Sequence, residues 1–586
     1  MKNTGCLSFR TRKGDAMKIF LCNVSKKSDT NAHDYVGLFY LAGALKEAGF
    51  EPLVFHGKLE HLLDEIEKNQ PGAVGFSCDF DNVRIIEDMS GKIKERWDIP
   101  VIVGGPQSIA LGRTFLESSG VDYILRGEGE ISLPMLLKAV LKDEGEIDRV
   151  KGLARIHDGV FLETPPEIIE DLDALPLPAY SASVHADHAY GNLIFTGRGC
   201  PYRCAYCAPS PGKRKVRLRS IPLVLEEIKV NLKNNPGLKC LIVMDDTFTL
   251  GRERIEEFCR GMTELRKDRD LVWYCECHVG RIRDFMDILP AMIDAGLIRL
   301  QIGIESGDQN VIDQYNKHVK IEDIVEFVTY AADCGLAQIA TNFIVGGPTE
   351  KDGATASLIR TLIDRAPGVI DIITGFLRAY PGTEIFENPG KFNLQLHDES
   401  GRRTGDDYPF VTPVGCSQDQ VMRQRQELNR VIRRSMQQKI KHRGLKEDAV
   451  RKQFEAAFKY GIRSRWFAEI SANPRAYEYY YVLFLNEGQA FEESLDFSRD
   501  YPQRTFELWR AMTFSDGFPQ LDGMALSPLE YELLLRCAGK RSLKKIQTEL
   551  YEVFGGSYEN EREFHRQLIE MLHRFDSKYW LTHFVV

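Results

Sequence analysis

The feature that most constrains the fold is an alternation of short apolar runs with amphipathic stretches between Met17 and Val140. The apolar runs are MKIFLCNV, EPLVF, AVGFS, IPVIVGG and VDYILRGEGE, and the stretches between them, such as GLFYLAGALKEAG, have helical periodicity. Strands that alternate with helices pair in parallel, because each helix returns the chain to start the next strand in the same direction. The pattern therefore predicts an open, doubly wound parallel sheet.

Ligands of such sheets bind beyond the carboxyl ends of the strands. Most of the loops at these ends carry glycines or other small residues, which allow a ligand to approach the backbone closely. The loops are Ser25–Tyr35, Cys78–Asn82, Gly104–Ser108 and Arg126–Glu130. We therefore expect a ligand site along this edge of the sheet.

A second α/β pattern follows the stretch DALPLPAYSA, whose prolines suit an extended connector rather than a helix. Six strands separated by helical stretches are predicted here. They are NLIFTGRG (192–199), CLIVMDDTF (240–248), LVWYCECHV (271–279), IRLQIGIES (298–306), AQIATNFIVGG (337–347) and DIITGFLRAY (371–380). Six βα units are too few for a closed eight-stranded barrel, so we expect an open, partial (β/α)6 barrel with its function at the carboxyl ends of the strands.

The C-terminal part is predicted to be helical. The basic positions of DQVMRQRQELNRVIRRSMQQKIK are interpreted as a solvated helix face rather than a nucleic-acid contact. Three helical segments, LSPLEYELLLRC, LKKIQTELYEVF and EREFHRQLIEMLHRF, predict a small unit at the end of the chain. The expected organisation is a polar extension (1–16), a doubly wound domain (17–145), a connector (146–190), the partial barrel (191–395), a helical region (396–520) and the small unit (521–586).

Composition argues against several classes of protein. Lys plus Arg number 76 against 85 for Asp plus Glu, a net charge of -9, so the chain has no global electrostatic footprint for nucleic acid. No apolar run approaches the ~18 to 20 residues that span a bilayer, so no membrane contact is expected. Thirteen cysteines, an odd number in a large chain, do not suit a secreted disulfide scaffold. We expect a cytoplasmic protein.

Three of these cysteines lie within eight residues, in Cys200-Pro-Tyr-Arg-Cys204-Ala-Tyr-Cys207, directly after a predicted strand. Three thiolates suit three irons of a [4Fe-4S] cluster and leave the fourth iron open. Structural zinc sites need four protein ligands, and no fourth Cys or His stands at a suitable short spacing. Cys275, Cys277 and His278 lie on another strand, where alternation puts the histidine opposite the cysteines; we interpret them as barrel packing.

The CxxxCxxC spacing with Tyr206 before the last cysteine resembles the signature of the radical S-adenosylmethionine (radical SAM) superfamily. The resemblance implies that Cys200, Cys204 and Cys207 bind the cluster and that its open iron chelates S-adenosylmethionine. Cleavage of that ligand would give a 5'-deoxyadenosyl radical. The ligand contacts implied by this and later motifs are Tyr206, Asp245, Asp246, Thr247, Gly303, Glu305, Ser306 and Gly346, with Ala379–Thr383 as a further strand-end motif. Lys317 and the basic run from Lys213 to Arg219 are either cofactor contacts or solvated residues.

The N-terminal motifs VGLFYLAGALKEAGFEP, VGGP and RGEGE resemble the cobalamin-binding branch of this superfamily and imply a Rossmann-like cobalamin domain. The implied contacts are Cys78, Gly104, Gly105, Gln107, Gly127, Glu128 and Gly129. Gln107 stands where the family motif has a histidine. His33 stands near the place of a cobalt-ligating histidine but in a different spacing, so we expect no protein imidazole below the cobalt. No GxGxxG follows the first strand, which disfavours a nicotinamide cofactor.

The resemblance implies a cobalamin-dependent methyltransferase that moves a methyl group from methylcobalamin to an unactivated carbon of a natural product or ribosomal peptide. The alternatives are a cobalamin-dependent cyclase, ring-contracting or rearranging enzyme, and a cobalamin sensor with a structural cluster. A flavodoxin- or ferredoxin-type protein is the expected electron donor. The small C-terminal unit resembles PqqD-like winged-helix elements, which bind leader peptides; it is either a structural cap or a peptide-recognition unit, and the latter requires strands near Phe514–Ala525.

Overall fold

The computed structural model describes residues 16–24, 36–55, 59–79, 82–184, 192–208, 214–397, 408–485, 488–489, 495–515 and 517–585. The chain forms two compact units. The first comprises residues up to Cys334 with Ala340–Leu358 and Ile373–Leu428, and the second comprises Gly335–Ile339, Ile359–Ile372 and Asn429–Val586. No helix in the described ranges is both long and apolar enough to cross a membrane.

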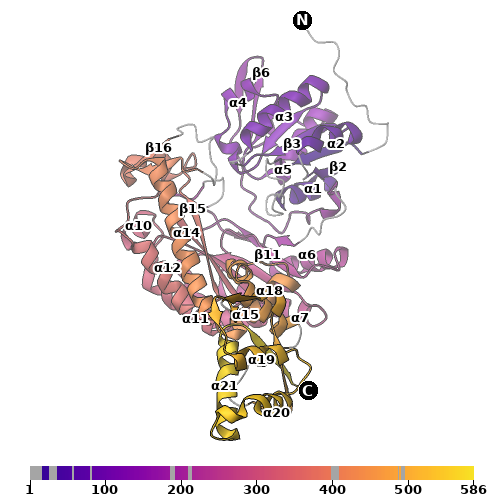
Figure 1. Cartoon of the computed structure of the whole chain (residues 1–586). Coiled ribbons are helices and arrows are strands. Elements are labelled where there is room, and N and C mark those ends of the chain that lie inside the picture. The colour runs from indigo at the N-terminus through magenta and orange to yellow at the C-terminus, as the bar shows by residue number, and fades with distance from the viewer. Residues whose placement is uncertain are drawn as a thin grey trace. The chain divides into compact units, whose positions relative to one another are not determined.

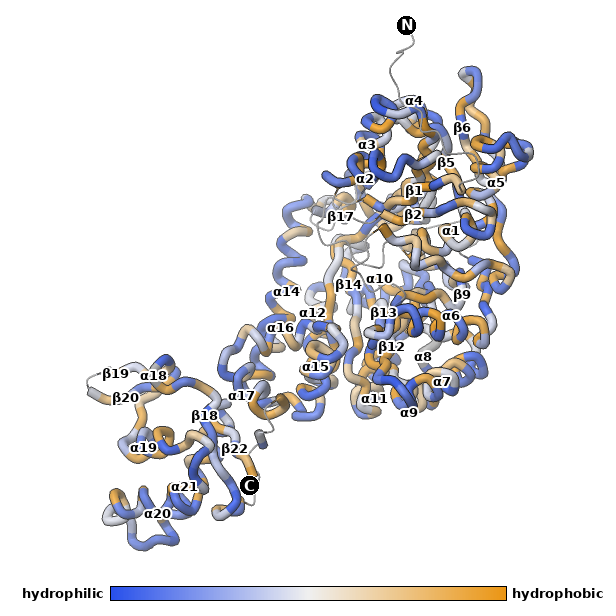
Figure 2. Tube along the Cα trace, turned by 90° about the vertical axis from the view of Figure 1, so that its right-hand side faces the viewer, coloured by the Kyte–Doolittle hydropathy of each residue, from blue (hydrophilic) through white to orange (hydrophobic). Residues whose placement is uncertain are grey.

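The N-terminal sheet is doubly wound, as predicted. Its parallel strands lie in the order β2 (Glu51–Phe55), β1 (Lys18–Cys22), β3 (Ala73–Ser77), β4 (Val101–Gly104), β5 (Tyr123–Leu125). Side chains of β1 alternate between two cores, because successive residues of a strand face opposite sides. Ile19 and Leu21 pack with α1 (Val36–Glu47) and α5 (Gly129–Lys142). Phe20 and Cys22 pack with α2 (Leu62–Asn69), α3 (Val83–Arg96) and α4 (Arg113–Ser118) (Figure 1). Figure 2 shows the apolar character of these strands.

Part of the predicted connector belongs to this sheet, which corrects the interpretation of residues 146–190. Strands β6 (Leu153–His157) and β7 (Val160–Glu163) form an antiparallel hairpin that pairs with β5 and extends the sheet to seven strands. The hairpin turns at Asp158 and Gly159, which both have positive φ. An Asp-Gly pair between two short strands is a strong hairpin signal, so the sequence contained the information.

The six predicted barrel strands form one sheet in the order β15 (Ile370–Phe376), β14 (Gln338–Val345), β13 (Leu297–Glu305), β12 (Val272–Cys277), β11 (Cys240–Val243), β8 (Leu193–Ile194). Neighbouring strands from β8 to β13 pair in parallel. Helices α6 (Ile221–Asn234), α7 (Arg252–Arg266), α11 (Ile321–Asp333) and α12 (Ala354–Arg365) separate them along the chain. The strand ends that carry the sequence motifs therefore meet at one edge of the sheet.

Short strand pairs flank this sheet. β9 (Gly197–Arg198) pairs with β10 (Arg217–Leu218), and β16 (Leu394–Leu396) pairs with β17 (Val411–Pro413), all antiparallel. The β9–β10 pair brackets the segment that holds the three clustered cysteines. The two ends of that segment are therefore held next to each other.

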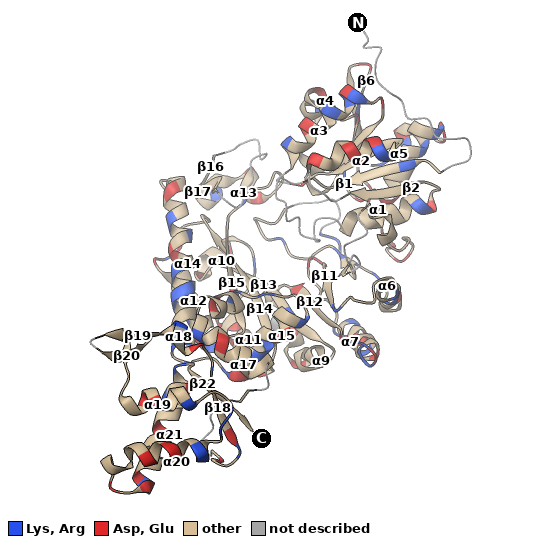
Figure 3. Ribbon diagram, turned by 45° about the vertical axis from the view of Figure 1, so that its right-hand side comes forward, with Lys and Arg blue, Asp and Glu red and all other residues tan. Residues whose placement is uncertain are grey.

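The long helix α14 (Gln418–Lys441) carries charged residues along its length (Figure 3). The second unit continues with α15 (Glu447–Lys459), α16 (Arg465–Ser471) and α17 (Pro474–Leu485). The three predicted terminal helices are confirmed as α19 (Pro528–Arg536), α20 (Leu543–Phe554) and α21 (Glu561–Ser577). Their shared core includes Leu533, Leu550 and Phe564.

The prediction that 396–520 is helical is wrong in its first part, where β17 precedes α14, and in its last part. β18 (Asp500–Arg504) pairs with β22 (Leu581–Val585), so the small C-terminal unit begins before residue 521. β19 (Met512–Ser515), β20 (Phe518–Leu521) and β21 (Met524–Ala525) form a three-stranded antiparallel sheet. These strands are two to five residues long, and a segment such as DYPQR has no apolar alternation to reveal a strand.

Candidate functional site

The three clustered cysteines lie in one loop at the edge of the barrel. Cys200 and Cys204 are buried, whereas Cys207 is partly exposed, and none of the three is in a disulfide. The Cys207 N–H donates to the Cys204 carbonyl at 3.1 Å, and the Ala205 N–H donates to the Tyr315 carbonyl at 3.0 Å. Backbone hydrogen bonds therefore fix the turn that presents the thiols. Burial raises the pKa of the Cys200 and Cys204 thiols.

A buried polar group lies beside this loop. Tyr206 donates its hydroxyl proton to Glu305 at 2.9 Å, and the Lys317 Nζ lies 2.7 Å from the same carboxylate oxygen and 3.0 Å from the Tyr206 hydroxyl. Lys317 and Glu305 are 3% and 6% exposed. The backbone of Glu305 is left-handed, with φ of 73°. A Cβ at Gly303 would lie 2.2 Å from the Glu305 carboxylate, so this arrangement requires glycine there. Lys317 is therefore part of the buried group rather than a solvated residue.

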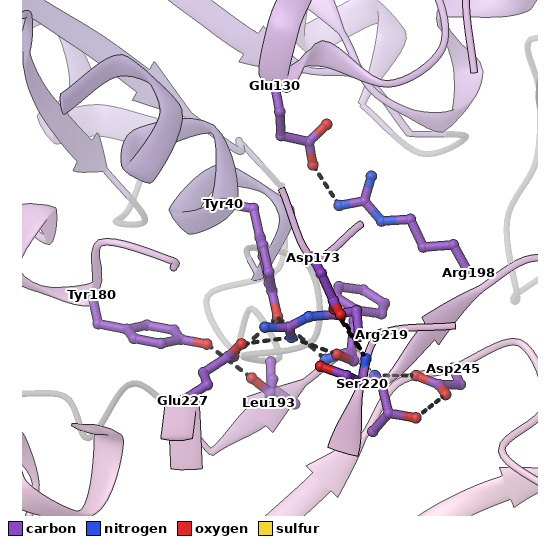
Figure 4. Close-up of polar contacts among 12 residues, drawn as sticks. Tyr40, Glu130, Asp173, Tyr180, Leu193, Arg198, Arg219, Ser220, Glu227 and Asp245 are labelled. Atoms are coloured by element: carbon purple, nitrogen blue, oxygen red, sulfur yellow. Dashed lines mark hydrogen bonds and ion pairs between the residues drawn. The ribbon is translucent and has the colours of Figure 1, made fainter. Parts of the chain in front are cut away.

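Two adjacent aspartates at the end of β11 have different surroundings. Asp245 is buried, and its two carboxylate oxygens accept hydrogen bonds from the backbone N–H (2.7 Å) and hydroxyl (2.5 Å) of Thr196 (Figure 4). Burial raises the pKa of Asp245 to about 6. Asp246 is exposed and lines a cavity. Asp245 therefore links β11 to the end of β8, and Asp246 is the better placed of the two to contact a ligand.

The remaining predicted ligand contacts lie at neighbouring strand ends. The Thr247 hydroxyl accepts a hydrogen bond from the His278 N–H at 3.2 Å. The Ser306 hydroxyl donates to Glu350 at 3.0 Å. Gly346 has φ of 84°, and a Cβ there would lie 2.8 Å from Val421. These contacts are made within the protein, so Thr247 and Ser306 hold the shape of the rim.

A cavity of about 580 Å³ lies at the carboxyl ends of the N-terminal strands and next to the cysteine loop. Five of the seven predicted cobalamin contacts line it: Gly104, Gly105, Gly127, Glu128 and Gly129. Residues that flank the cysteines, namely Arg198, Gly199 and Ala208, line the same cavity. The predicted cobalamin loops and the residues beside the cysteine loop therefore line one space. The loop Ser25–Tyr35, with His33, lies outside the described residues.

Cys78 and Gln107 are not among the residues that line this cavity. Both residues are buried, and their backbone hydrogen bonds fix the loop that follows β4. The Cys78 N–H donates to the Gly104 carbonyl at 2.8 Å, and the Gln107 N–H donates to the Cys78 carbonyl at 3.0 Å. Gly105 has φ of 95°, and a Cβ there would lie 2.7 Å from the backbone nitrogen and oxygen of Cys78. The loop can take this path only with glycine at position 105.

Ion pairs join the cavity loop to the segment that carries the cysteines. Arg198 lies 2.5 Å from Glu130 (Figure 4) and 3.2 Å from Glu128, and Arg217 lies 2.7 Å from Glu128. Burial opposes ionisation of Glu128, but the hydrogen bond from Arg217 and the charge of Arg198 outweigh it and lower the pKa of this carboxyl. Arg217, from the basic run of the sequence, therefore pairs with a protein carboxylate.

A second buried group lies beside the cavity. Tyr40, on α1, donates its hydroxyl proton to Glu227, on α6, at 3.0 Å (Figure 4). Arg219 lies 2.6 Å from Glu227 and donates to the Phe195 carbonyl at 2.8 Å. The rings of Tyr40 and Phe195 both line the cavity and contact each other edge to face, with centroids 5.7 Å apart. No sequence motif indicated this group, because its members come from three distant segments.

Two family models match the two regions that form this site. The B12 binding domain matches residues 26–137, and the Radical SAM superfamily matches residues 194–362. The first match includes the cavity loops, and the second includes the three cysteines and the motifs through Glu350. This chain carries a B12-binding domain followed by a radical SAM domain. The family predicted from the cysteine spacing and the N-terminal motifs is confirmed.

Curated relatives of this radical SAM protein include two kinds of enzyme. An uncharacterized methyltransferase, PH0819, from Pyrococcus horikoshii is 28% identical, over 62% of this chain and 79% of that protein. Anaerobic magnesium-protoporphyrin IX monomethyl ester cyclase from Rubrivivax gelatinosus is 28% identical, over 64% and 68% of the two chains. Hopanoid C-3 methylase from Methylococcus capsulatus is 25% identical, over 67% and 74%.

The solved structure of the cobalamin-dependent S-adenosylmethionine radical enzyme OxsB, with aqua-cobalamin and S-adenosylmethionine bound, shares the fold. It aligns with a TM-score of 0.56 and 14% identity, over 96% of this chain and 84% of that chain. The α/β fold class predicted from the sequence, with a Rossmann-like N-terminal region, a radical SAM core and a helical C-terminal region, is confirmed.

The predicted cofactors, a [4Fe-4S] cluster, S-adenosylmethionine and cobalamin, are those of the two matched domains. The cysteine loop fits the cluster, because it offers three thiols free of disulfides that can each bind a different iron. Within the described ranges, no group of three His, Cys, Asp or Glu side chains could bind one metal ion. A [4Fe-4S] cluster does not require such a group, because each cysteine binds a different iron. Gly104, Gly105, Gly127 and Gly129 line the cavity, and glycine lets a cobalamin placed there approach the backbone closely.

Proposed function

We propose that this chain is a cobalamin-dependent radical SAM methyltransferase that methylates an unactivated carbon of a small-molecule or peptide substrate. The observation that carries the proposal is the shared cavity. Strand-end loops of the B12-binding domain and residues flanking Cys200 and Cys207 line one space of about 580 Å³. A substrate carbon placed in this cavity would be close to both cofactor sites. Radical formation at one cofactor and methyl transfer from the other require this closeness. Curated methyltransferases among the relatives support the same function.

In this proposal, Cys200, Cys204 and Cys207 bind the cluster, and Glu305, Lys317, Tyr206 and Asp246 form the S-adenosylmethionine site. Gly104, Gly105, Gly127 and Gly129 give cobalamin close access to the backbone. When bound, these cofactors supply one-electron cleavage of S-adenosylmethionine and a transferable methyl group. The protein orients them and restricts water: Lys317 fixes the Glu305 carboxylate and the Tyr206 hydroxyl, and the rings of Tyr40 and Phe195 form an apolar wall.

Further expectations from the sequence remain part of the proposal. The chain acts in the cytoplasm and takes electrons from a flavodoxin- or ferredoxin-type protein. The proposal keeps the predicted domain organisation with two changes: the B12-binding domain includes the β6–β7 hairpin, and the C-terminal unit includes β18. The small sheet β19–β21 provides strands in the stretch that peptide recognition requires.

The test uses anaerobically purified protein with its cluster rebuilt, supplied with dithionite, S-adenosylmethionine and hydroxocobalamin. Mass spectrometry quantifies S-adenosylhomocysteine and 5'-deoxyadenosine. Both products, with the first dependent on cobalamin, are expected. Deoxyadenosine alone would instead favour a cyclase or rearranging enzyme, and neither product would favour a cobalamin-binding sensor. Cys204→Ala is expected to lose the cluster and both products while it still binds cobalamin, and product formation by that variant would contradict the assignment of Cys204.

A further inference from the structure

His278 lies at the end of β12, beside the cysteine loop. Strand alternation predicted that Cys275 and Cys277 face one side and His278 the other, and the structure agrees. Both cysteines are buried, at 0% and 5% exposure, whereas the imidazole contacts two residues of the cysteine loop. The His278 N–H donates to the Thr247 hydroxyl, which fixes the backbone at this point. His278 is thus held at the rim by contacts that barrel packing does not require.

The orientation of the imidazole is set on two sides. Its ring stacks on that of Tyr202, with centroids 3.5 Å apart and planes inclined by 10°. The Gly280 N–H donates to Nδ1 at 3.0 Å. Because Nδ1 accepts this hydrogen bond, the proton of the neutral imidazole is on Nε2. A Cβ at position 280 would lie 3.0 Å from Nδ1, so glycine allows the close approach.

The Nε2 atom, with its proton, lies 3.8 Å from the Cys204 sulfur. This distance suits an N–H···S hydrogen bond, which is longer than one to oxygen because sulfur is larger. Hydrogen bonds to cluster sulfurs are one of the factors that set the reduction potential of an iron-sulfur cluster. A donor stabilises the reduced cluster more than the oxidised one, because the reduced cluster carries more negative charge.

We propose that His278 is a positioning residue whose Nε2–H donates to the Cys204 thiolate and raises the reduction potential of the cluster held by this loop. The inference rests on the proposed function, since it requires that Cys204 binds the cluster. His278 exchanges no electron or proton. It changes only the relative free energies of the oxidised and reduced cluster, and so the fraction of enzyme that a donor of given potential can reduce.

The first test is a redox titration of the cluster, followed by electron paramagnetic resonance, in protein free of S-adenosylmethionine and cobalamin. His278→Phe keeps a ring to stack on Tyr202 and removes the donor. At a fixed ambient potential, we expect its ratio of reduced to oxidised cluster to fall about ten-fold, equivalent to ~59 mV for one electron. His278→Gln, whose amide N–H can reach the position of Nε2, is expected to recover part of the shift. Tyr202→Phe, which keeps the ring, is the matched control and should titrate like the wild type.

A second test avoids substitution. In wild-type protein with ¹⁵N-labelled histidine, pulsed electron paramagnetic resonance of the reduced cluster is expected to show a weak ¹⁵N coupling. No coupling would overturn the proposal, and so would a coupling as strong as that of a directly bound nitrogen. This measurement decides the matter if His278→Phe fails to retain iron and sulfide.

The two hypotheses fail in different ways. A wild-type protein that binds no cluster would refute the proposed function and the inference together. A wild-type protein with a cluster, and a His278→Phe variant with full iron and sulfide content and an unchanged potential, would refute the inference alone. A potential lowered equally in His278→Phe and His278→Gln would also refute it, because the loss would then follow the imidazole and not the donor.

Discussion

Replacement of Glu227 by Gln tests whether the buried group beside the cavity holds the B12-binding domain on the radical SAM core. Glu227 is 1% exposed and accepts hydrogen bonds from Tyr40 and Arg219, at 3.0 and 2.6 Å. Arg219 is 6% exposed. Glutamine has nearly the same shape, so the substitution removes the charge without leaving a cavity. It leaves the Arg219 guanidinium buried without its counter-charge.

The expected cost follows from that uncompensated charge. Removal of one partner from a buried ion pair typically costs about 3 to 5 kcal/mol. With an entropy of unfolding near 2.1 cal/mol/K per residue, such a loss corresponds to a fall in Tm of about 4 to 6 °C for the first unit, which has about 400 residues. Tyr40→Phe keeps the ion pair. It removes the hydrogen bond to the carboxylate and the longer ones, at 3.4 Å, that the Tyr40 hydroxyl accepts from the Phe195 N–H and from Arg219, so its cost is expected to be about 1.5 to 3 kcal/mol.

The assay compares the apo forms by thermal unfolding and by hydrogen exchange read by mass spectrometry. Exchange should accelerate in peptides from α1 and α6 and stay unchanged in peptides from α20. Glu226→Gln is the matched control, because Glu226 is the preceding residue of α6 and is exposed; its effect should be within about 0.5 kcal/mol. If Glu227→Gln unfolds like Glu226→Gln and protects α1 as the wild type does, the reasoning is wrong.

Three further predictions follow from the site. Gly105→Ala places a Cβ 2.7 Å from the Cys78 backbone and should raise the Kd for hydroxocobalamin at least about ten-fold in a spectrophotometric titration. Gly112→Ala is the control, because a Cβ there has nothing within 4 Å, and it should bind hydroxocobalamin like the wild type. Equal affinities of the two variants would contradict the placement of cobalamin. Lys317→Met removes the cation that fixes Glu305 and Tyr206, so calorimetry should show S-adenosylmethionine binding weakened about ten-fold. Lys320→Met changes an exposed lysine and should bind S-adenosylmethionine like the wild type. Burial raises the pKa of Asp245 to about 6, above the ~3.9 of an unfolded chain, so this carboxyl stabilises the fold below about pH 4 and loses that contribution as the pH rises through 6. The Tm of the wild type should therefore fall relative to Asp245→Asn between about pH 4 and 6, and parallel curves would refute the shift.

Local patterns identified most of the secondary structure and the central motif. All six barrel strands and the five parallel N-terminal strands were predicted. The reason is that apolar side chains recur about every two residues on the buried face of a strand and about every 3.6 residues on that of a helix. The cysteine spacing also lies within eight residues, so one short segment indicated a cluster. The β6–β7 hairpin was missed although its Asp158-Gly159 turn is a local hairpin signal, and β18 was missed because its sequence DYPQR has no apolar alternation.

The sequence by itself determined the α/β class, the three candidate cluster ligands and the glycines that a cofactor can approach closely. Only the tertiary structure decided which side chains face a ligand and which hold the site together. Asp245 and Asp246 are neighbours with the same chemistry, yet one is buried against Thr196 and the other lines the cavity. Tyr40 and Glu227 are 187 residues apart, and their hydrogen bond has no local signature. A repeat in sequence reports which face of an element is buried, whereas the partner of a buried polar group is set by packing between distant elements.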